Sequence, residues 1–310
     1  MNRTPVIGRF APSPTGDLHF GSLVAAIGSY LEAKSRRGTW LLRIEDIDPP
    51  REVAGSAERI TADLERLGMR PDGPVLYQSQ RLDAFDAALA QLMAAGLAYP
   101  CACTRKDLPE SGIYPGTCRN GITPGKQARS VRFNVGDHHR VFDDGIQGQI
   151  EEHPATSSGD FVIRRADGLY AYQLAVVVDD AFQGVTQVVR GADLLNSTAR
   201  QICLQEALGY PTPKYMHLPV AVSADDRKLS KRERSDPVKH QDPAFAVARA
   251  LSFLGHEPPR SYSLQGLWDW ALDNWNSDLI PRRRTIPLAD MAAADRAGTK
   301  GLNNKDRLVL

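Results

Sequence analysis

Hydrophobic and polar positions in the first third of the chain follow strand and helix periods in turn. Residues 6–10 and 39–47 have the pattern of two buried strands, and Glu45 falls near the carboxyl end of the second. Apolar residues recur at the helical period in three further segments, 20–31, 53–67 and 82–92, which end at Gly38, Gly68 and Gly96. This alternation predicts an α/β fold in which helices cover a parallel sheet.

The pattern changes after residue 98. From 99 to about 160 the chain is rich in Gly, Pro, Ser and His and holds three of the four cysteines, which indicates an insertion. Regular elements resume with an apolar run at 174–178, a strand at 185–190 and a helix face at 194–202, beside which Cys203 is expected to be buried. We therefore predict four parts: the first half of the α/β domain at 1–98, the insertion at 99–165, the second half at 166–240 and a small helical region at 241–310.

In the small helical region, Trp268 and Trp275 lie at helical spacing from several leucines. We expect both tryptophans in the core and not as stacking platforms for nucleic-acid bases. The end of the chain from Pro281 is polar and basic, and it is predicted to be frayed.

Composition narrows the class of protein. With 310 residues, of which 42% are hydrophobic and 24% charged, the chain is typical of globular proteins. It has neither a run of about 20 apolar residues nor an apolar segment after its N-terminal charge, so we expect a cytoplasmic protein without membrane contact. We also expect a monomer. Its 38 basic and 37 acidic residues give a net charge of +1, so a nucleic-acid partner would need a local basic surface.

Two short segments carry candidate chemistry. The first, His19 to Ser22, follows a loop of Pro and Gly residues and begins a predicted helix, where free backbone N–H groups attract phosphates. Gly21 would let a nucleotide approach the backbone, and His19 would donate a hydrogen bond to a phosphate oxygen. The plainer interpretation is a buried histidine and a packing glycine. The second segment, 227–232, is basic and suited to closing over a triphosphate, although such a cluster alone is more typical of a solvated surface.

Together the two segments point to a family. His19-Phe20-Gly21-Ser22 resembles the HIGH motif, and Lys228 to Arg232 resembles the KMSKS motif, of class I aminoacyl-tRNA synthetases. Segments 8–16, 43–48 and 190–195 are similar to those of the glutamyl branch. The resemblance covers roughly residues 5–240 and implies a Rossmann-like catalytic domain, with the HIGH-like motif in its first half and the KMSKS-like motif in its second.

The resemblance also implies which residues bind the substrates. ATP, with Mg²⁺, would be bound by His19, Gly21, Lys228, Ser230 and Lys231, of which His19, Gly21 and Lys231 would also be catalytic. L-glutamate would be bound by Arg9, Ser13, Glu45, Tyr172 and Arg190, with Glu45 on the α-amine and Arg190 on the side-chain carboxylate. A guanidinium pairs well with a carboxylate and poorly with an amide, which favours glutamate over glutamine. We interpret the neighbouring Arg43 as part of a structural ion pair.

Three cysteines lie close together in the insertion. Cys101, Cys103 and Cys118 fall within eighteen residues, which suits a metal site better than a disulfide framework. Zinc needs a fourth ligand, and by chemistry alone a histidine such as His138 or His139 is the first choice. The Cys-x-Cys, Tyr, Cys pattern, however, is similar to the zinc site of the glutamyl-Q tRNA(Asp) synthetase family, which implies Tyr114 as the fourth ligand of one structural zinc ion.

The length of the chain bears on which group of the tRNA receives the activated glutamate. Only 78 residues follow the KMSKS-like motif, fewer than the anticodon-reading domain of the glutamyl-tRNA synthetases needs. The resemblance to the glutamyl-Q family implies a ligase that activates glutamate without tRNA and transfers it to the queuosine base of tRNA(Asp), with Arg227, Arg232 and the insertion facing the RNA. Two alternatives stay open: a compact synthetase that charges a tRNA 3′ end, and a non-catalytic synthetase-like protein that binds RNA.

Overall fold

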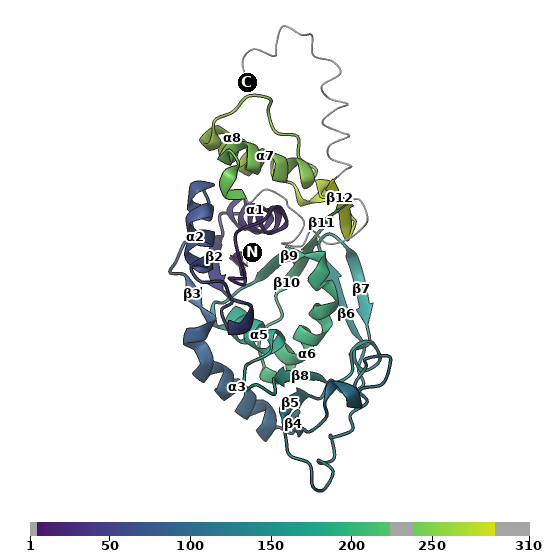
Figure 1. Ribbon diagram of the computed structural model, residues 1–310. Helices are drawn as coiled ribbons and strands as arrows, with labels where there is room; N and C mark the ends of the chain where they lie inside the picture. Colours follow the sequence, from purple (N-terminus) through teal and green to yellow (C-terminus); the bar gives the residue numbers. More distant parts are fainter. Residues whose placement is uncertain (1–4, 224–237, 289–310) are drawn as a thin grey trace.

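A parallel sheet forms the centre of the structure, a computed structural model that describes residues 5–223 and 238–288 (Figure 1). One half of the sheet has the order β1-β2-β3 and the other β7-β6-β10-β9; β6 and β7 pair antiparallel and the other neighbours parallel. The halves adjoin where Thr186 donates its backbone N–H to the carbonyl of Ile7 at 3.0 Å. The predicted parallel sheet is therefore confirmed. Its strands are β1 Ile7–Phe10, β2 Thr39–Ile44, β3 Leu76–Tyr77, β6 Arg140–Asp144, β7 Gly148–Glu152, β9 Gln187–Gly191 and β10 Lys214–Leu218.

Helices cover both faces of this sheet. Successive residues of β1 point to opposite sides, so that Gly8 faces Ala33 of α1 whereas Arg9 pairs with Asp180 of α5. A β-carbon at Gly8 would lie 3.4 Å from that of Ala33, which shows how closely α1 packs on the strand. The apolar run at 174–178 lies within α5. The helices of this part are α1 Phe20–Lys34, α2 Ser56–Arg66, α3 Leu82–Ala94, α5 Tyr172–Phe182 and α6 Thr198–Leu208.

A second, antiparallel sheet lies in the insertion. It has the order β4-β5-β8, and the short helix α4 precedes β8. The hairpin of β6 and β7 comes from the same stretch of sequence but pairs with β10 through Asp144 and Tyr215. Residues 140–152 thus extend the main sheet, and the predicted boundaries at 98, 165 and 240 stay a prediction. The elements of the insertion are β4 Ala98–Cys101, β5 Ser130–Phe133, α4 Pro154–Ser157 and β8 Phe161–Arg164.

The C-terminal helices α7 (Pro243–Phe253) and α8 (Leu264–Asn274) pack against α1 and share its hydrophobic core. Trp268 is 5% exposed, and its indole N–H donates to the carbonyl of Leu67 at 2.8 Å. Trp275 packs against the same core and donates to Glu32 Oε2 at 3.0 Å. The expectation that these tryptophans belong to the core is confirmed, as is the burial of Cys203.

The expectation that the chain frays from Pro281 is wrong as far as residue 288. Strand β12 (Thr285–Pro287) pairs in parallel with β11 (Val220–Val222), and Val220 donates its N–H to the carbonyl of Arg284 at 2.9 Å. The pairing satisfies backbone groups at the edge of β11, which a frayed chain would leave to solvent. Among the described residues, no helix combines the length and apolar character that crossing a membrane requires.

Short 3₁₀ helices connect several of these elements. They lie at Pro49–Arg51, Gln78–Arg81, Arg105–Asp107, Ala192–Ser197, Val238–His240 and Ser277–Leu279. The predicted helix face at 194–202 is accordingly divided between a 3₁₀ turn and α6. The carboxyl ends of β1, β2 and β9 and the start of α1 meet at one end of the sheet, where open α/β folds bind their ligands.

Candidate active site

The structure gathers the described candidates for ATP and glutamate binding around one cavity of about 730 Å³. Its lining comes from the ends of β1, β2 and β9, the start of α1 and the start of α5. The remaining candidates, Lys228, Ser230 and Lys231, lie outside the described residues. The candidates that line the cavity are Arg9, Ser13, His19, Gly21, Glu45, Tyr172 and Arg190.

His19 caps the N-terminus of α1. Its Nδ1 accepts the backbone N–H of Ser22 at 3.2 Å, so in the neutral ring the proton is on Nε2, which lies 3.0 Å from the Ser22 hydroxyl. A β-carbon at Gly21 would lie 3.3 Å from the ring of His19. The glycine therefore leaves room for the histidine to hold this position beside the first turn of the helix.

The loop between β1 and α1 is fastened to neighbouring elements. The hydroxyl of Ser56, at the start of α2, donates to the carbonyl of Gly16 at 2.7 Å and accepts its N–H at 3.0 Å. The carbonyl of Pro12 accepts the N–H of Glu45 at 3.0 Å. Ser13, which lies between these two anchors, is exposed at the mouth of the cavity. The loop is thereby positioned by both α2 and the end of β2.

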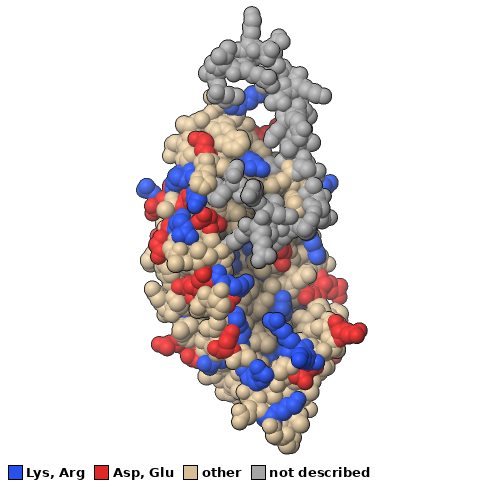
Figure 2. Space-filling model, in the orientation of Figure 1, with Lys and Arg blue, Asp and Glu red and all other residues tan. Residues whose placement is uncertain are grey.

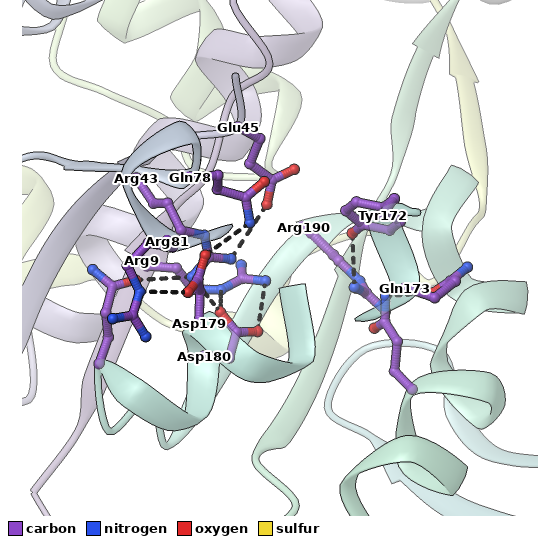
Figure 3. A network of polar contacts seen from close by, with 12 residues as sticks. Arg9, Arg43, Glu45, Gln78, Arg81, Tyr172, Gln173, Asp179, Asp180 and Arg190 are labelled. Carbon is purple, nitrogen blue, oxygen red and sulfur yellow. Dashed lines mark hydrogen bonds and ion pairs between the residues drawn. The ribbon is translucent and has the colours of Figure 1, made fainter. Parts of the chain in front are cut away.

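Buried ion pairs connect strands β1 and β2 to helix α5 beneath Glu45 (Figure 3). Asp180 of α5 accepts Arg9 Nε at 3.0 Å and Arg43 Nη1 at 2.7 Å, and Arg43 Nη2 donates to Glu45 Oε1 at 3.3 Å. Arg43 is fully buried, and the interpretation of this residue as part of a structural ion pair is confirmed. Burial raises the pKa of Glu45 above its usual range, while Arg43 and Arg9 oppose that rise.

The network extends to the neighbouring Asp179, whose charge also acts on Arg43. This carboxylate accepts Arg81 Nε at 3.1 Å and the amide nitrogen of Gln78 at 3.0 Å. The amide oxygen of Gln78 is buried and has no hydrogen-bond partner among the described residues, although Gln78 lines the cavity. Three arginines and three carboxylates balance one another in this network: Arg9, Arg43, Arg81, Glu45, Asp179 and Asp180.

Arg190 lies on the other side of the cavity, at the end of β9. Its Nη1 donates to the Tyr172 hydroxyl at 3.3 Å and its Nη2 to the Thr198 hydroxyl at 3.0 Å, and its Nε lies 3.0 Å from His217 Nε2 (Tyr172 is drawn in Figure 3). The guanidinium is thus fixed in a plane by several side chains. Arg190 is 5% exposed, so a ligand in the cavity meets a largely dehydrated cation.

The three cysteines of the insertion form a separate cluster. Cys103 Sγ lies 3.7 Å from Cys118 Sγ, and the hydroxyl of Tyr114 lies 3.3 Å from Cys101 Sγ and 3.6 Å from Cys103 Sγ. Zinc–sulfur bonds of about 2.3 Å and zinc–oxygen bonds of about 2.0 Å in a tetrahedron require ligand separations of about 3.5–3.8 Å. The four side chains therefore fit one tetrahedral ion.

The histidine alternative does not fit this cluster. Among the described residues, the group of His, Cys, Asp and Glu ligand atoms lying within 4.8 Å of one another consists of the three cysteines alone. His139 stacks on His153 with 4.4 Å between ring centroids and lies 3.3 Å from Glu151. The first choice from chemistry alone is therefore wrong, because the histidines and the thiols lie on different parts of the insertion.

An arginine, Arg132, contacts two members of the cysteine and tyrosine cluster. Arg132 Nε donates to Cys101 Sγ at 3.3 Å, and its guanidinium lies over the ring of Tyr114 at 3.8 Å from the centroid. Its Nη1 donates to the carbonyl of Asp160 at 2.7 Å, and the carboxylate of Asp160 accepts Arg119 Nε at 2.6 Å. A cation in this place offsets part of the negative charge that three thiolates and a phenolate would bring.

Three residues that the sequence pattern did not single out contact the residues that line the pocket, directly or through a neighbour. Asp180 joins Arg9 to Arg43, and His217 with Asp144 stands behind Arg190. The chain offered no signal for these three, because an acidic residue in a helix or a strand and a histidine in a strand are ordinary in any sequence. Their proximity to the pocket depends on the pairing of distant elements.

The fold and this site define a class I synthetase. The family model "tRNA synthetases class I (E and Q), catalytic domain" matches residues 5–112 and 116–264, and the chain belongs to this family. Among curated proteins, it is 53% identical over 290 residues to the glutamyl-Q tRNA(Asp) synthetase of Aromatoleum aromaticum, which covers 90% of this chain and 91% of that protein. It is 50% identical over 297 residues to the protein of the same name in Dechloromonas aromatica, with 92% and 99% covered.

Solved structures agree with this assignment. The chain matches the glutamate-tRNA synthetase of Elizabethkingia anophelis with a TM-score of 0.78 and 26% identity, over 98% of this chain and 72% of that one. A glutamate tRNA ligase from Elizabethkingia meningosepticum, solved in complex with its amino acid, matches with a TM-score of 0.75 and 27% identity, over 90% and 66%. The resemblance seen in the sequence, and the expected Rossmann-like class I fold, are confirmed.

Proposed function

We propose that this protein activates L-glutamate with ATP, without needing tRNA, and transfers the glutamyl group to the queuosine base of tRNA(Asp). The observation that carries the proposal is the meeting of Arg190, Glu45 and His19 around one cavity. The relatives at 50% and 53% identity named glutamyl-Q tRNA(Asp) synthetase support the choice of acceptor.

The cavity offers a partner for each charge of glutamate. Arg190 binds the side-chain carboxylate, with the hydroxyl of Tyr172 beside it, and Glu45 binds the α-ammonium group. The unpaired amide oxygen of Gln78 is a second acceptor available to that ammonium group. Arg9, which is held by Asp180, and Ser13 bind the α-carboxylate.

ATP occupies the side of the cavity at the start of α1. An oxygen of the glutamate α-carboxylate forms a bond to the α-phosphorus, the bond from that phosphorus to its bridging oxygen breaks, and pyrophosphate leaves with Mg²⁺. His19 and Gly21 hold the nucleotide at the helix N-terminus, where free N–H groups stabilise negative charge. Lys228, Ser230 and Lys231 are proposed to contact the phosphates. No protein nucleophile is required, because positioning and charge stabilisation suffice.

In the second step the acceptor group of queuosine attacks the glutamyl carbonyl and AMP leaves. Arg51 and Arg165 line the cavity and both pair with Asp48, so cationic groups stand at the place where RNA must approach. Figure 2 shows Lys and Arg side chains along the middle of the lower half of the drawn face, with acidic side chains mostly toward its margins. Such a local basic surface satisfies the requirement set by a net charge of +1.

Cys101, Cys103, Tyr114 and Cys118 are proposed to hold one zinc ion. Zinc bound there would cross-link the strand β4 to the loop that follows it, a structural role. Although burial opposes it, hydrogen bonds from Tyr114 and the backbone of Ala102 lower the pKa of Cys118 to about 7, toward the thiolate that binds metal.

Two assays test the proposed function. Glutamate-dependent exchange of pyrophosphate into ATP should proceed in the complete absence of tRNA. Labelled glutamate should then be transferred to tRNA(Asp) that carries queuosine and not to the same tRNA without it. Equal labelling of both tRNAs would overturn the assignment of the modified base.

The similarity to two glutamate tRNA ligases gives the alternative, charging of a tRNA 3′ end, a specific basis. Periodate oxidation before the assay separates the two acceptors when it is applied to tRNA without queuosine, because it destroys the 3′-terminal diol. Labelling that is independent of queuosine and abolished by this oxidation would establish the alternative.

A further inference from the structure

Within the described part of the chain, the hydrogen bonds of Arg190 all go to groups without charge. Its described partners are the hydroxyls of Tyr172 and Thr198, the carbonyl of Leu194 at 3.5 Å and the ring of His217. Among the described residues, no carboxylate lies within ion-pair distance of this guanidinium. Arg9, Arg43 and Arg81 differ from it, because each of them pairs with a carboxylate.

His217 is held in one tautomer. The guanidinium Nε–H of Arg190 can only donate, so His217 Nε2 at 3.0 Å must accept, and the ring proton lies on Nδ1. That Nδ1 lies 2.5 Å from Asp144 Oδ2, and both side chains are fully buried. Burial, with the nearby charge of Arg190, lowers the pKa of His217 despite the hydrogen bond to Asp144, which keeps the ring neutral.

Asp144 is itself fixed by the backbone. Its Oδ1 accepts the N–H groups of Ile146 at 3.0 Å, Gln147 at 2.9 Å and His217 at 3.1 Å. The carboxylate therefore stays in place at the end of β6, next to β10, and its charge reaches Arg190 only across the imidazole ring. A neutral ring between a cation and an anion keeps the geometry of a pair while preventing their direct contact.

The charges around the cavity then have an uneven distribution. Among residues 5–223 and 238–288, the network beneath Glu45 contains three cations and three anions, whereas Arg190 has no anion in contact with it. Glutamate at neutral pH has a net charge of −1 and glutamine has none. Binding glutamate gives this buried cation an anion in direct contact, and binding glutamine leaves it with uncharged partners alone in a dehydrated site, which is costly.

We propose that His217, oriented by Asp144, is a positioning residue that fixes Arg190 through a neutral acceptor and so reserves the arginine's charge for the side-chain carboxylate of the substrate. The inference rests on the proposed function, since it names the means by which the same pocket selects glutamate over glutamine. Thr198 and Tyr172 contribute in the same way, by accepting hydrogen bonds without supplying a countercharge.

The matched variants Thr198→Asp and Thr198→Asn test the charge argument. Thr198 is buried at the start of α6 with its hydroxyl 3.0 Å from Arg190 Nη2, and an acidic residue suits the first turn of a helix. We expect Thr198→Asp to lower the ratio of kcat/KM for glutamate to that for glutamine by about 10- to 100-fold in pyrophosphate exchange. Thr198→Asn should keep this ratio within about 3-fold of the wild type. An unchanged ratio in Thr198→Asp, in protein with a wild-type melting temperature, would overturn the proposal.

The role of His217 needs a variant pair of its own. His217→Leu removes the acceptor, and we expect the KM for glutamate to rise about 10- to 100-fold while the KM for ATP stays within about 2-fold. His217→Gln, which keeps a neutral acceptor, should recover part of the loss. Equal rises in both KM values would indicate a merely structural role and would contradict the inference.

Nuclear magnetic resonance gives a readout that does not depend on activity. In full-length protein labelled with ¹⁵N at histidine, the His217 signal, assigned by its loss in His217→Gln, should show protonation at Nδ1 and a bare Nε2 at pH 7. A proton on Nε2 would overturn the inference even if glutamate activation is established. Failure of wild-type protein to exchange pyrophosphate with glutamate would instead refute the proposed function, and calorimetric binding of glutamate and glutamine would then decide the selectivity argument.

Discussion

Arg43 and Asp180 form an ion pair beneath the candidate glutamate pocket, with Nη1 2.7 Å from Oδ1 and side chains that are 0% and 8% exposed. Asp180 also accepts Arg9, so one carboxylate holds two arginines on adjacent strands. The pair connects β2 to α5 and thereby fixes Arg43, which in turn donates a hydrogen bond to Glu45. Its contribution is to keep the pocket in one arrangement, because removing one member leaves buried charge without a partner.

We expect Asp180→Asn to lower the free energy of unfolding by about 3–5 kcal/mol, since Arg9 and Arg43 would keep their charges without a full counterion. Urea denaturation followed by circular dichroism measures this change. Glu206→Gln is the control, because Glu206 is about half exposed in its pair with Arg140 and should cost less than about 1 kcal/mol. Equal effects of the two substitutions would contradict the account of the buried network.

The affinity for glutamate should fall as the solution becomes more acidic. Burial raises the pKa of Glu45, against the opposing charges of Arg43 and Arg9, so protonation begins above the usual pH range of a glutamate. A protonated Glu45 cannot pair with the α-ammonium group, and the KM for glutamate should therefore rise as pH falls through that raised pKa. The profile is measured by pyrophosphate exchange from pH 8 down to about 5.

Glu45→Gln should raise the KM for glutamate about 10- to 100-fold at pH 7.5 and remove most of its dependence on pH. Glu58→Gln, at an exposed position of α2, should behave as the wild type. A pH profile that survives intact in Glu45→Gln would show that another group is responsible.

Gly21→Ala should lower activity without lowering stability. The new methyl group would lie 3.3 Å from the ring of His19, which would have to shift by a few tenths of an ångström beside the ATP site. We expect kcat/KM for ATP to fall about 10-fold, while alanine in the first turn of α1 maintains or raises the melting temperature.

Gly73→Ala is the matched control, because its added β-carbon would meet Leu41 at an ordinary 3.6 Å. Wild-type kinetics in Gly21→Ala would show that ATP activation does not depend on the absence of a side chain at position 21, next to the ring of His19.

Metal analysis tests the cysteine cluster. Purified wild-type protein should contain one zinc ion per chain, and Cys103→Ser should lose it or bind it at least about 10-fold more weakly. Cys203→Ser serves as the control, since Cys203 is buried in a different hydrophobic cluster and should leave the zinc content unchanged.

Tyr114→Phe tests the fourth ligand separately. A phenyl ring preserves the packing under Arg132 but removes the oxygen that lies 3.3 Å from Cys101 Sγ. We expect weaker zinc binding in competition with a chromophoric chelator. Full zinc affinity in this variant would exclude Tyr114 from the ligand set.

Local patterns in the sequence determined much of this protein. The helical period at 20–31 and the strand at 6–10 appear in the structure as α1 and β1, because each pattern reflects one element that buries one face. His19 and Glu45, which the short motifs singled out, line the same cavity, since both lie where an element begins or ends and their place follows from the element itself.

The tertiary structure alone decided which distant residues meet. Arg43 and Asp180 are 137 residues apart, and His217 and Asp144 are 73 apart. Likewise, the strand at 285–287 forms because β11 presents an edge to it, although it is only three residues long and follows directly on the basic run at 282–284. The spacing of residues along the chain determines the faces of single helices and strands. Which charges are buried, which tautomer His217 adopts and what net charge the pocket has depend instead on which of those faces pack together.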